Sequence, residues 1–274
     1  MSISLRDVGP VMLVGVGNMG LAMARGWVDA GLPPSNLILI APRPSAAAQA
    51  FADENGITIH PEASGLQPNI IVLAVKPKMI ESVAESLAPV VGPHTVGVSV
   101  AAGIGLDRLV RAFGKGKVVR SMPNTPTQVG KGVTGAVSGP DVTDEDRAKV
   151  EALLAAGGIV PWFDDEAAID VVTAVSGSGP AYVFHMVEAL AAAARAQGMD
   201  DVMADRLARQ TIVGAAALME ADPASATVLR QNVTSPNGTT AAGLSVLMGE
   251  NGLSDLMTRT VQAARDRAEE MGRD

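Results

Sequence analysis

The chain has 274 residues, a formal net charge of −8 and 47% hydrophobic residues, which is enough for one large domain or two ordinary ones with a full core. Acidic balance without a basic run repels a phosphate backbone, so we expect no nucleic-acid partner. The absence of cysteine excludes disulfides, thiolate nucleophiles and cysteine-ligated zinc. We expect no metal site, and any anionic ligand must be held locally.

Neither an export signal nor a membrane span is indicated. Residues 1–10 contain one Arg, one Asp and no apolar core of signal-peptide length. The longest uncharged stretch, residues 171–187, is interrupted by Gly177-Ser178-Gly179-Pro180 and is too short to span a membrane. We therefore expect a soluble, cytoplasmic protein with no membrane partner.

Short apolar runs alternate with helix-like segments from residue 11 to residue 163, a rhythm typical of strand–helix units in a mainly parallel sheet. The predicted strands are residues 11–16, 37–41, 57–60, 70–75, 95–100, 118–122, 133–137 and 159–163. This pattern predicts an α/β fold whose N-terminal domain, residues 1–165, is a Rossmann-type, doubly wound sheet.

After Asp164 the strand-like runs stop, and segments rich in Ala, Met, Val and Leu are typical of helices. Residues 182–196 and 211–219 are apolar on nearly every side, more than a helix with one face in water requires. We predict an all-helical domain over residues 166–274 that forms a homodimer or a higher homo-oligomer. A monomeric bundle with two central helices is the alternative.

A glycine-rich loop follows the first predicted strand and opens a helix. Gly15, Gly17, Asn18, Met19 and Gly20 belong to a G-x-G-x-x-G pattern in the strand–turn–helix context that binds dinucleotides. The glycines allow a tight turn and close approach of the backbone to the pyrophosphate, which sits on helix N-terminal amides. A glycine-rich turn without a ligand is the alternative.

The end of the second predicted strand indicates which dinucleotide binds. No Asp or Glu follows it to accept a hydrogen bond from a ribose hydroxyl, and the chain continues as Ala41-Pro42-Arg43-Pro44-Ser45. A guanidinium and a hydroxyl suit the additional phosphate of NADP. NADPH is therefore favoured as the cofactor, and NADH is possible. The alternative interpretation of Arg43 is a solvated charge in a loop.

Two further strand ends belong to the edge at which open α/β sheets bind ligands. Ala74-Val75-Lys76-Pro77 follows the fourth strand, and Asn124 follows the sixth. Lys76 can neutralise a phosphate or orient a ribose, and Asn124 can reach nicotinamide or its ribose. We predict that Ala74, Val75, Lys76, Pro77 and Asn124 contribute to the cofactor site, with simple turn chemistry as the alternative.

Proton donors are scarce in the helical domain. Every lysine lies at or before position 149, which removes the general-acid lysine that hydroxyacid dehydrogenases of similar layout carry there. His185, on an apolar helix after Tyr182, is typical of a packing residue, and Glu188 is open between a cap and an interface role. An imine substrate resolves the shortage, because a protonated C=N group needs only hydride delivery.

Hydroxyls, turn formers and a new helix start are concentrated in residues 233–243. The segment reads Val-Thr-Ser-Pro-Asn-Gly-Thr-Thr-Ala-Ala-Gly. Helix N-terminal amides bind anions without a basic side chain, because they point at the ligand at the positive end of the helix dipole. The segment therefore predicts a neutral site for a small anionic substrate.

The chain resembles the pyrroline-5-carboxylate reductase family over nearly its whole length. The segments that carry the resemblance are the loop at residues 15–19, Val75-Lys76-Pro77, residues 120–126, residues 176–182 and residues 235–244. Two positions depart from the family pattern. Asn237 stands where glycine is frequent, a mild change because Asn tolerates a left-handed backbone. Pro42 stands where an asparagine often precedes the arginine, which leaves Arg43 more alone.

This resemblance implies NADPH-dependent reduction of 1-pyrroline-5-carboxylate to L-proline, the last step of proline biosynthesis. It also implies that Ser235, Asn237, Gly238 and Thr239 bind the substrate carboxylate, and that Thr240 is the catalytic residue beside the ring nitrogen. Family members dimerise through the helical domain. The alternatives are a hydroxyacid dehydrogenase, disfavoured by the missing lysine, and a non-catalytic dinucleotide-binding protein, which has no use for the hydroxyl-rich segment.

Overall fold

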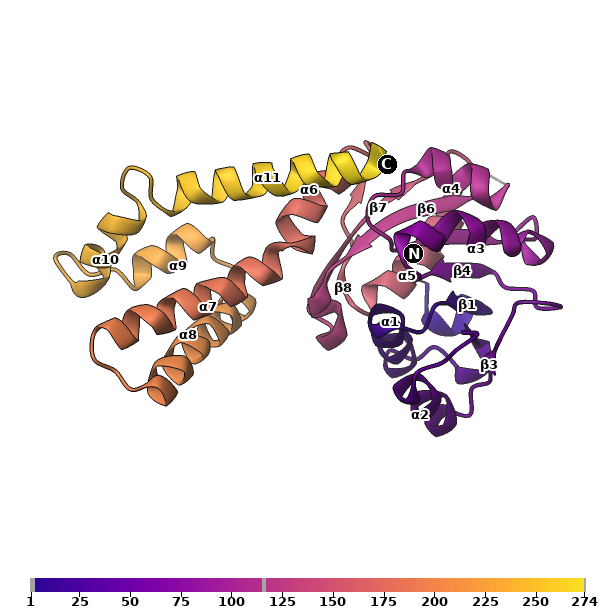
Figure 1. Cartoon of the computed structure of the whole chain (residues 1–274), viewed down its shortest axis with the longest axis horizontal. Helices are drawn as coiled ribbons and strands as arrows, with labels where there is room; N and C mark the ends of the chain where they lie inside the picture. Colours follow the sequence, from indigo (N-terminus) through magenta and orange to yellow (C-terminus); the bar gives the residue numbers. More distant parts are fainter. Residues whose placement is uncertain (1–2, 115–116, 274) are drawn as a thin grey trace. The chain divides into compact units, whose positions relative to one another are not determined.

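The computed structural model describes residues 3–114 and 117–273 and divides into two compact units (Figure 1). The first contains Met1–Ser178 and Ala264–Asp274, and the second contains Gly179–Ala263. The boundary predicted from the sequence lies between residues 165 and 166. Residues beyond that point stay with the first unit because they pack on its sheet; a Cβ atom at Gly135 would lie only 2.8 Å from Val172.

The first unit is built on a mainly parallel sheet. Its strands are β1 (Val11–Val14), β2 (Leu37–Ile40), β3 (Ile59–His60), β4 (Ile70–Leu73), β5 (Val96–Ser99), β6 (Val118–Pro123), β7 (Gly132–Ser138), β8 (Gly158–Ile159) and β9 (Trp162–Phe163). The order is β3-β2-β1-β4-β5-β6-β7-β8, with β9 also paired to β7. Neighbours from β3 to β6 run parallel, whereas β6 and β7 run antiparallel. The predicted Rossmann-type sheet is confirmed.

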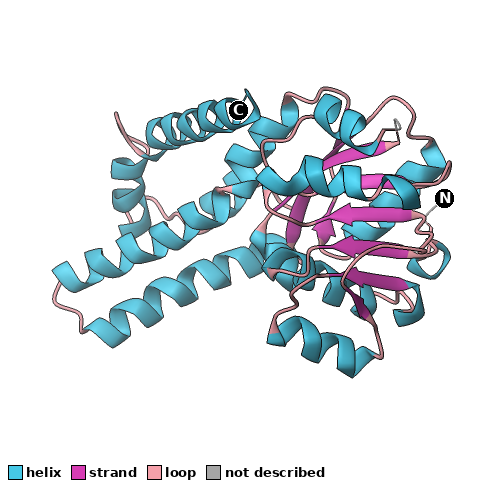
Figure 2. Cartoon of the chain, turned by 45° about the vertical axis from the view of Figure 1, so that its right-hand side comes forward, coloured by secondary structure: helices cyan, strands magenta, loops and turns pink. Residues whose placement is uncertain are grey.

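Helices lie on both sides of this sheet (Figure 2). They are α1 (Asn18–Asp29), α2 (Ala46–Asn55), α3 (Ile80–Ser86), α4 (Leu106–Phe113), α5 (Asp144–Ala155) and α6 (Ala168–Val172), the last of which continues into a π-helix (Thr173–Gly177). Trp27 and Leu153 belong to one buried apolar cluster, and Ile80 and Leu109 belong to another. The doubly wound layering follows from apolar strands that are buried on both faces.

One predicted strand, residues 159–163, is two short strands in the structure. β8 pairs with the start of β7, whereas β9 pairs with its middle. Gly158 has φ 137°, and a Cβ atom there would lie 2.0 Å from the carbonyl oxygen of Gly132. This close backbone approach, together with Pro161 between the pieces, interrupts the strand, because proline donates no ladder hydrogen bond.

The second unit is all helical, as expected. It contains α7 (Gly179–Ala196), α8 (Asp201–Ala221), α9 (Ala226–Asn232), α10 (Thr239–Leu247) and the first part of α11 (Leu253–Arg273). Many of its large apolar side chains are exposed, including Phe184 at 64% and Val246 at 76%. Within the described residues no single helix is long and apolar enough to span a bilayer, although α8 and α9 pass that test jointly across a bend of 118°.

Candidate functional site

The glycine loop between β1 and α1 gives each of its glycines a separate role. Gly15 has φ 95°, and a Cβ atom there would lie 2.6 Å from the carbonyl oxygen of Ala74. A Cβ atom at Gly20 would lie 2.1 Å from the carbonyl oxygen of Gly15, whereas one at Gly17 would meet no atom within 4 Å. The loop therefore combines a left-handed turn, tight helix–strand packing and an open approach to the backbone, as a dinucleotide loop requires.

The N-terminus of α1 is suited to an anion. Gly17 is its N-cap residue and makes no side-chain capping hydrogen bond, and the first turn, which begins at Asn18 and Met19, carries no acidic residue. The first N–H groups of a helix have no partner within the helix, and the positive end of the helix dipole lies there. This geometry fits the pyrophosphate of a dinucleotide.

The predicted strand ends meet at one edge of the sheet. Val14 of β1 is in register with Ile40 of β2 and with Leu73 of β4. The N–H of Gly15 donates to the carbonyl of Ile40 at 3.0 Å, and the N–H of Ala74 donates to the carbonyl of Val14 at 2.8 Å. The segments that contain Arg43 and residues 74–77 therefore flank the glycine loop.

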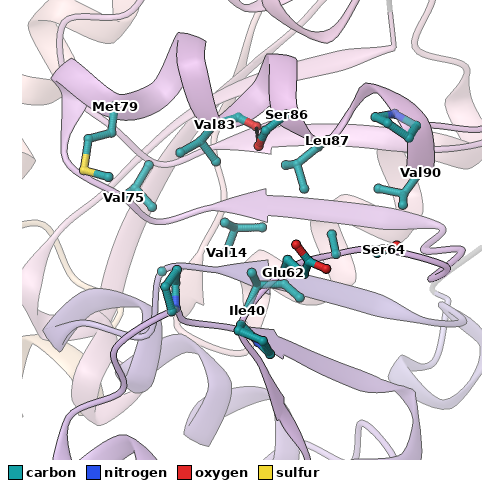
Figure 3. Close-up of a pocket in the computed structure, with 15 residues that line it drawn as sticks. Val14, Ile40, Glu62, Ser64, Val75, Met79, Val83, Ser86, Leu87 and Val90 are labelled. Atoms are coloured by element: carbon teal, nitrogen blue, oxygen red, sulfur yellow. Dashed lines mark hydrogen bonds between the residues drawn. The ribbon is translucent and has the colours of Figure 1, made fainter.

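A pocket of about 350 Å³ opens at this edge (Figure 3). Val14, Gly15 and Ile40 line it from β1, the glycine loop and β2, and Val75 and Val83 line it from the segment after β4 and from α3. Its size and largely apolar walls are typical of a pocket for a small molecule.

The side chains of Arg43 and Lys76 are exposed beside this pocket. Pro42 lines the pocket directly before Arg43, and Val75 lines it directly before Lys76. An exposed cation can meet a phosphate without paying the cost of burying an unpaired charge. Both positions therefore suit a role on the phosphate groups of a cofactor.

Several pocket residues were not recognised in the sequence. Met79, Val83 and Leu87 come from α3 and the turns next to it, and Glu62 and Ser64 come from the loop after β3. The apolar residues carry no motif, so they are recognisable only once α3 is known to cover this edge. The position of Glu62 after a strand next to β2 was the one available signal, because carboxyl ends of neighbouring parallel strands share an edge.

Asn124 is buried at the end of β6, with 7% of the residue exposed. Its Nδ2 donates to the carbonyl of Ser176 at 3.0 Å, and its Oδ1 accepts from the N–H of Val133 at 2.9 Å. Both ends of the amide therefore have backbone partners within the first unit. The side chain expected to reach nicotinamide joins two protein segments.

The hydroxyl-rich segment lies in the second unit and leads into α10. Asn237 has φ 59°, which explains how it replaces a glycine at this turn. Gly238 is the N-cap residue without a side-chain capping bond, and a Cβ atom there would lie 2.3 Å from Oγ of Ser235. Thr239 and Thr240 are the first residues of the helix, and both are exposed. Helix amides and nearby hydroxyls in this arrangement can hold an anion without a basic side chain.

Two further groups of charged residues are each paired within their own unit. Arg120 is buried and bonds Glu166 at 2.8 Å and Asp170 at 3.2 Å, and Glu166 also accepts from the N–H of Leu106 at the start of α4. On α7, Nδ1 of His185 lies 2.9 Å from Glu188, and both side chains are exposed. The first group joins β6, α4 and α6, which indicates a structural role.

A glycine-loop sheet joined to a helical unit is the architecture of a dinucleotide-dependent oxidoreductase. Residues 166–271 match a family model described as pyrroline-5-carboxylate reductase dimerisation, and residues 10–103 match one described as NADP oxidoreductase coenzyme F420-dependent. A pyrroline-5-carboxylate reductase from Vibrio alginolyticus is 38% identical over 95% of this chain and 97% of its own length. The chain therefore belongs to the pyrroline-5-carboxylate reductase family.

Solved structures agree with this assignment. A pyrroline-5-carboxylate reductase from Coxiella burnetii has a TM-score of 0.90 at 33% identity, covering 97% of this chain and 99% of the other. A pyrroline carboxylate reductase from Plasmodium falciparum, solved with NADP bound, has a TM-score of 0.80 at 29% identity, covering 96% of this chain and 98% of the other. The similarity therefore includes both units.

Proposed function

We propose that this protein reduces the cyclic imine 1-pyrroline-5-carboxylate to L-proline with NADPH, the last step of proline biosynthesis. The observation that carries the proposal is the presence, in one chain, of the glycine loop at Gly15–Gly20 and the hydroxyl-rich segment at the start of α10. The names of the relatives support the substrate, and the structure with NADP bound supports the cofactor.

The cofactor site comprises the glycine loop and the neighbouring strand ends. The backbone of Gly15, Gly17, Asn18, Met19 and Gly20 cradles the pyrophosphate, where added Cβ atoms at Gly15 and Gly20 would collide with backbone. Ala74 and Val75 lie against Gly15, and the exposed Lys76 and Pro77 follow them at the rim of the site. Nicotinamide, when bound, supplies the hydride.

Preference for NADPH over NADH is assigned to Arg43. It is exposed in the loop after β2, where an acidic residue that would repel a 2′-phosphate is missing. Its guanidinium can pair with that phosphate through two parallel hydrogen bonds. NADH remains usable in this account, because the glycine loop recognises the pyrophosphate that both cofactors share.

The substrate site needs no strong acid or base. The N–H groups at the start of α10, the residues Asn237 and Gly238 before it and the hydroxyl of Ser235 hold the carboxylate, and Thr239 completes this set. Thr240 orients the ring nitrogen through its hydroxyl. A protonated C=N group is already electrophilic, so acceleration comes mainly from positioning the imine carbon for hydride addition.

A homodimer formed through the second unit belongs to the same proposal. Phe184, Leu218 and Val246 are large, apolar and more than 60% exposed in the isolated chain. Apolar side chains in such numbers are typical of a surface covered by another subunit. We also place the protein in the cytoplasm, because a cysteine-free chain is compatible with a reducing compartment.

A spectrophotometric assay tests the function. Purified protein is given NADPH or NADH with 1-pyrroline-5-carboxylate, and the loss of nicotinamide absorbance is followed. The proposal expects turnover with this imine and a higher kcat/KM for NADPH than for NADH. Oxidation of NADPH by 2-keto acids without turnover of the imine would instead identify a hydroxyacid dehydrogenase, and binding without turnover of either would identify a dinucleotide-binding protein.

A further inference from the structure

The Ser176 carbonyl accepts a hydrogen bond from outside its own helix. In a regular α-helix it would accept from the N–H of residue 180, but Pro180 has no N–H. Ser176 lies in the π-helix, where the N–H of Ser178 reaches back five residues to the carbonyl of Thr173 at 2.9 Å. The side-chain amide of Asn124 supplies the donor that the proline cannot.

The segment around Ser176 is packed closely against the sheet. A Cβ atom at Gly177 would lie 3.0 Å from the end of the Met122 side chain, and Val172 lies over Gly135. Oγ of Ser176 donates to the carbonyl of Val172 at 3.0 Å. The Asn124 hydrogen bond makes this packing specific, because it forms only when the Asn124 amide faces the carbonyl of Ser176.

This hydrogen bond lies at the edge of the sheet where ligands bind. Asn124 follows β6 at the carboxyl edge of the parallel strands, where ligands of such sheets bind. Gly177 and Ser178 are the last residues of the first unit before Gly179 begins α7 and the second unit. The hydrogen bond thus joins the ligand-binding edge to the segment from which the chain enters the helical unit. π-Helical turns are frequent at functional sites.

We propose that Asn124 is a positioning residue, whose side-chain amide, matched to the missing N–H of Pro180, fixes the segment that leads into α7. This inference rests on the proposed reductase function. In this role Asn124 stabilises the backbone at Ser176 and does not contact nicotinamide. The consequence is a split in kinetic effects: losing the amide lowers kcat while leaving the affinity for NADPH largely intact.

The test is a double-mutant cycle between Asn124 and Pro180. Asn124→Asp, measured at alkaline pH so that the carboxyl is ionised, keeps an oxygen acceptor for Val133 and removes the donor to Ser176. Pro180→Ala restores an N–H at the position from which a helix would satisfy Ser176. Asn55→Asp is the matched control, because the Asn55 amide donates to the carbonyl of Phe51 at 2.8 Å on α2, away from the π-helix.

Two quantities are measured for each variant: kcat with the Kd for NADPH, and hydrogen exchange of the amides in residues 173–182. Loss of the buried hydrogen bond in Asn124→Asp should lower kcat about tenfold, accelerate exchange in that segment and change the NADPH Kd less than about twofold. In the Pro180→Ala background the same substitution should have a much smaller effect on both. Asn55→Asp should leave exchange in residues 173–182 and kcat unchanged.

The possible failures are distinguishable. If Asn124→Asp had equal effects in the wild-type and Pro180→Ala backgrounds, the Asn124 amide would not compensate for the N–H that Pro180 lacks, and the proposal would be wrong. A rise in the NADPH Kd as large as the fall in kcat would indicate that Asn124 contacts the cofactor directly. If the wild-type protein did not reduce the imine, the proposed function would fail, whereas hydrogen exchange would still decide whether Asn124 holds the segment.

Discussion

The two units of this chain bury their apolar side chains to very different extents. In the first unit, large residues such as Trp27, Leu13 and Ile71 are fully buried between helices and strands. In the second unit, the buried positions of α7 and α8 are the small residues Ala191, Ala204 and Ala208. The first unit therefore contains its own core, whereas the second unit leaves large apolar side chains exposed in the isolated chain.

The largest expected difference between the two units is in the effect of truncating one aromatic side chain in each. Trp27→Ala should destabilise the first unit by about 3–5 kcal/mol, because it leaves a large cavity. It also leaves the Leu153 carbonyl without the donor that now lies at 2.9 Å. Phe184→Ala, at an exposed position, should instead weaken self-association and lower the midpoint of unfolding at a given protein concentration. Chemical denaturation at several protein concentrations, with analytical ultracentrifugation, measures both effects.

Equal loss of stability from the two truncations, with no change in association, would contradict the difference between the units. A concentration-independent midpoint for the wild-type protein would carry the same meaning. Both results would favour a monomer in which the second unit is stable by itself.

Thr240→Ala separates the units by function. Removing one hydrogen bond that acts near the reacting nitrogen should lower kcat/KM for the imine by about 10- to 100-fold with little change in the Kd for NADPH. Thr260→Ala is the control, because the Thr260 hydroxyl donates to the carbonyl of Leu256 on the exposed side of α11. Steady-state kinetics and cofactor titration provide the two values. An unchanged kcat/KM in Thr240→Ala would remove this residue from the substrate site.

Arg43→Ala is the corresponding change in the first unit. Loss of a charged pair with the 2′-phosphate should raise KM for NADPH by about tenfold, because paired charged hydrogen bonds contribute more than neutral ones. KM for NADH should hardly change. Arg6→Ala, an exposed arginine at the start of the chain, is the control for net charge. If KM rose equally for both cofactors, Arg43 would have a structural role instead.

The smallest predicted effect concerns pH. Burial raises the pKa of Asp146, but hydrogen bonds from Lys117 and Thr143 outweigh it and hold that pKa below its usual value. A carboxyl with a lowered folded-state pKa contributes stability above its unfolded pKa and loses it as the pH falls through the folded pKa. Asp146→Asn should therefore cost about 1 kcal/mol at neutral pH and progressively less in acid.

The matched change in the second unit is Asp201→Asn. Asp201 is an exposed partner of Arg195 at 2.8 Å, and exposed ion pairs are screened by solvent. Unfolding measured from neutral to acidic pH should show a pH-dependent difference for Asp146→Asn and a small, flat one for Asp201→Asn. Identical profiles would show that the hydrogen bonds from Lys117 and Thr143 to Asp146 have no special role in stability.

Local patterns predicted the features that depend on neighbouring residues. The runs around β1, β2 and β4 were identified because apolar residues in sequence are enough to mark a buried strand. The glycine loop was identified because its spacing follows from backbone geometry. The left-handed backbone at Asn237 agrees with the resemblance, in which Asn stands where glycine is frequent.

Long-range partners were not predictable in the same way. The split between β8 and β9 depends on Gly158 meeting Gly132, and the return of Ala264–Asp274 to the first unit depends on contacts far apart in sequence. The bond between Asn124 and Ser176 joins residues that no periodic pattern relates. The candidate site was therefore predictable as two motifs, but the supports that hold them were not.

A crystal structure with NADP and L-proline bound tests the central claim most directly, because proline is the proposed product. The account predicts the proline carboxylate within hydrogen-bond distance of Oγ of Ser235 and of the N–H groups at the start of α10. It also predicts the pyrophosphate on the Gly15–Gly20 loop. Proline bound elsewhere, or a carboxylate paired with an arginine instead of these neutral groups, would contradict it.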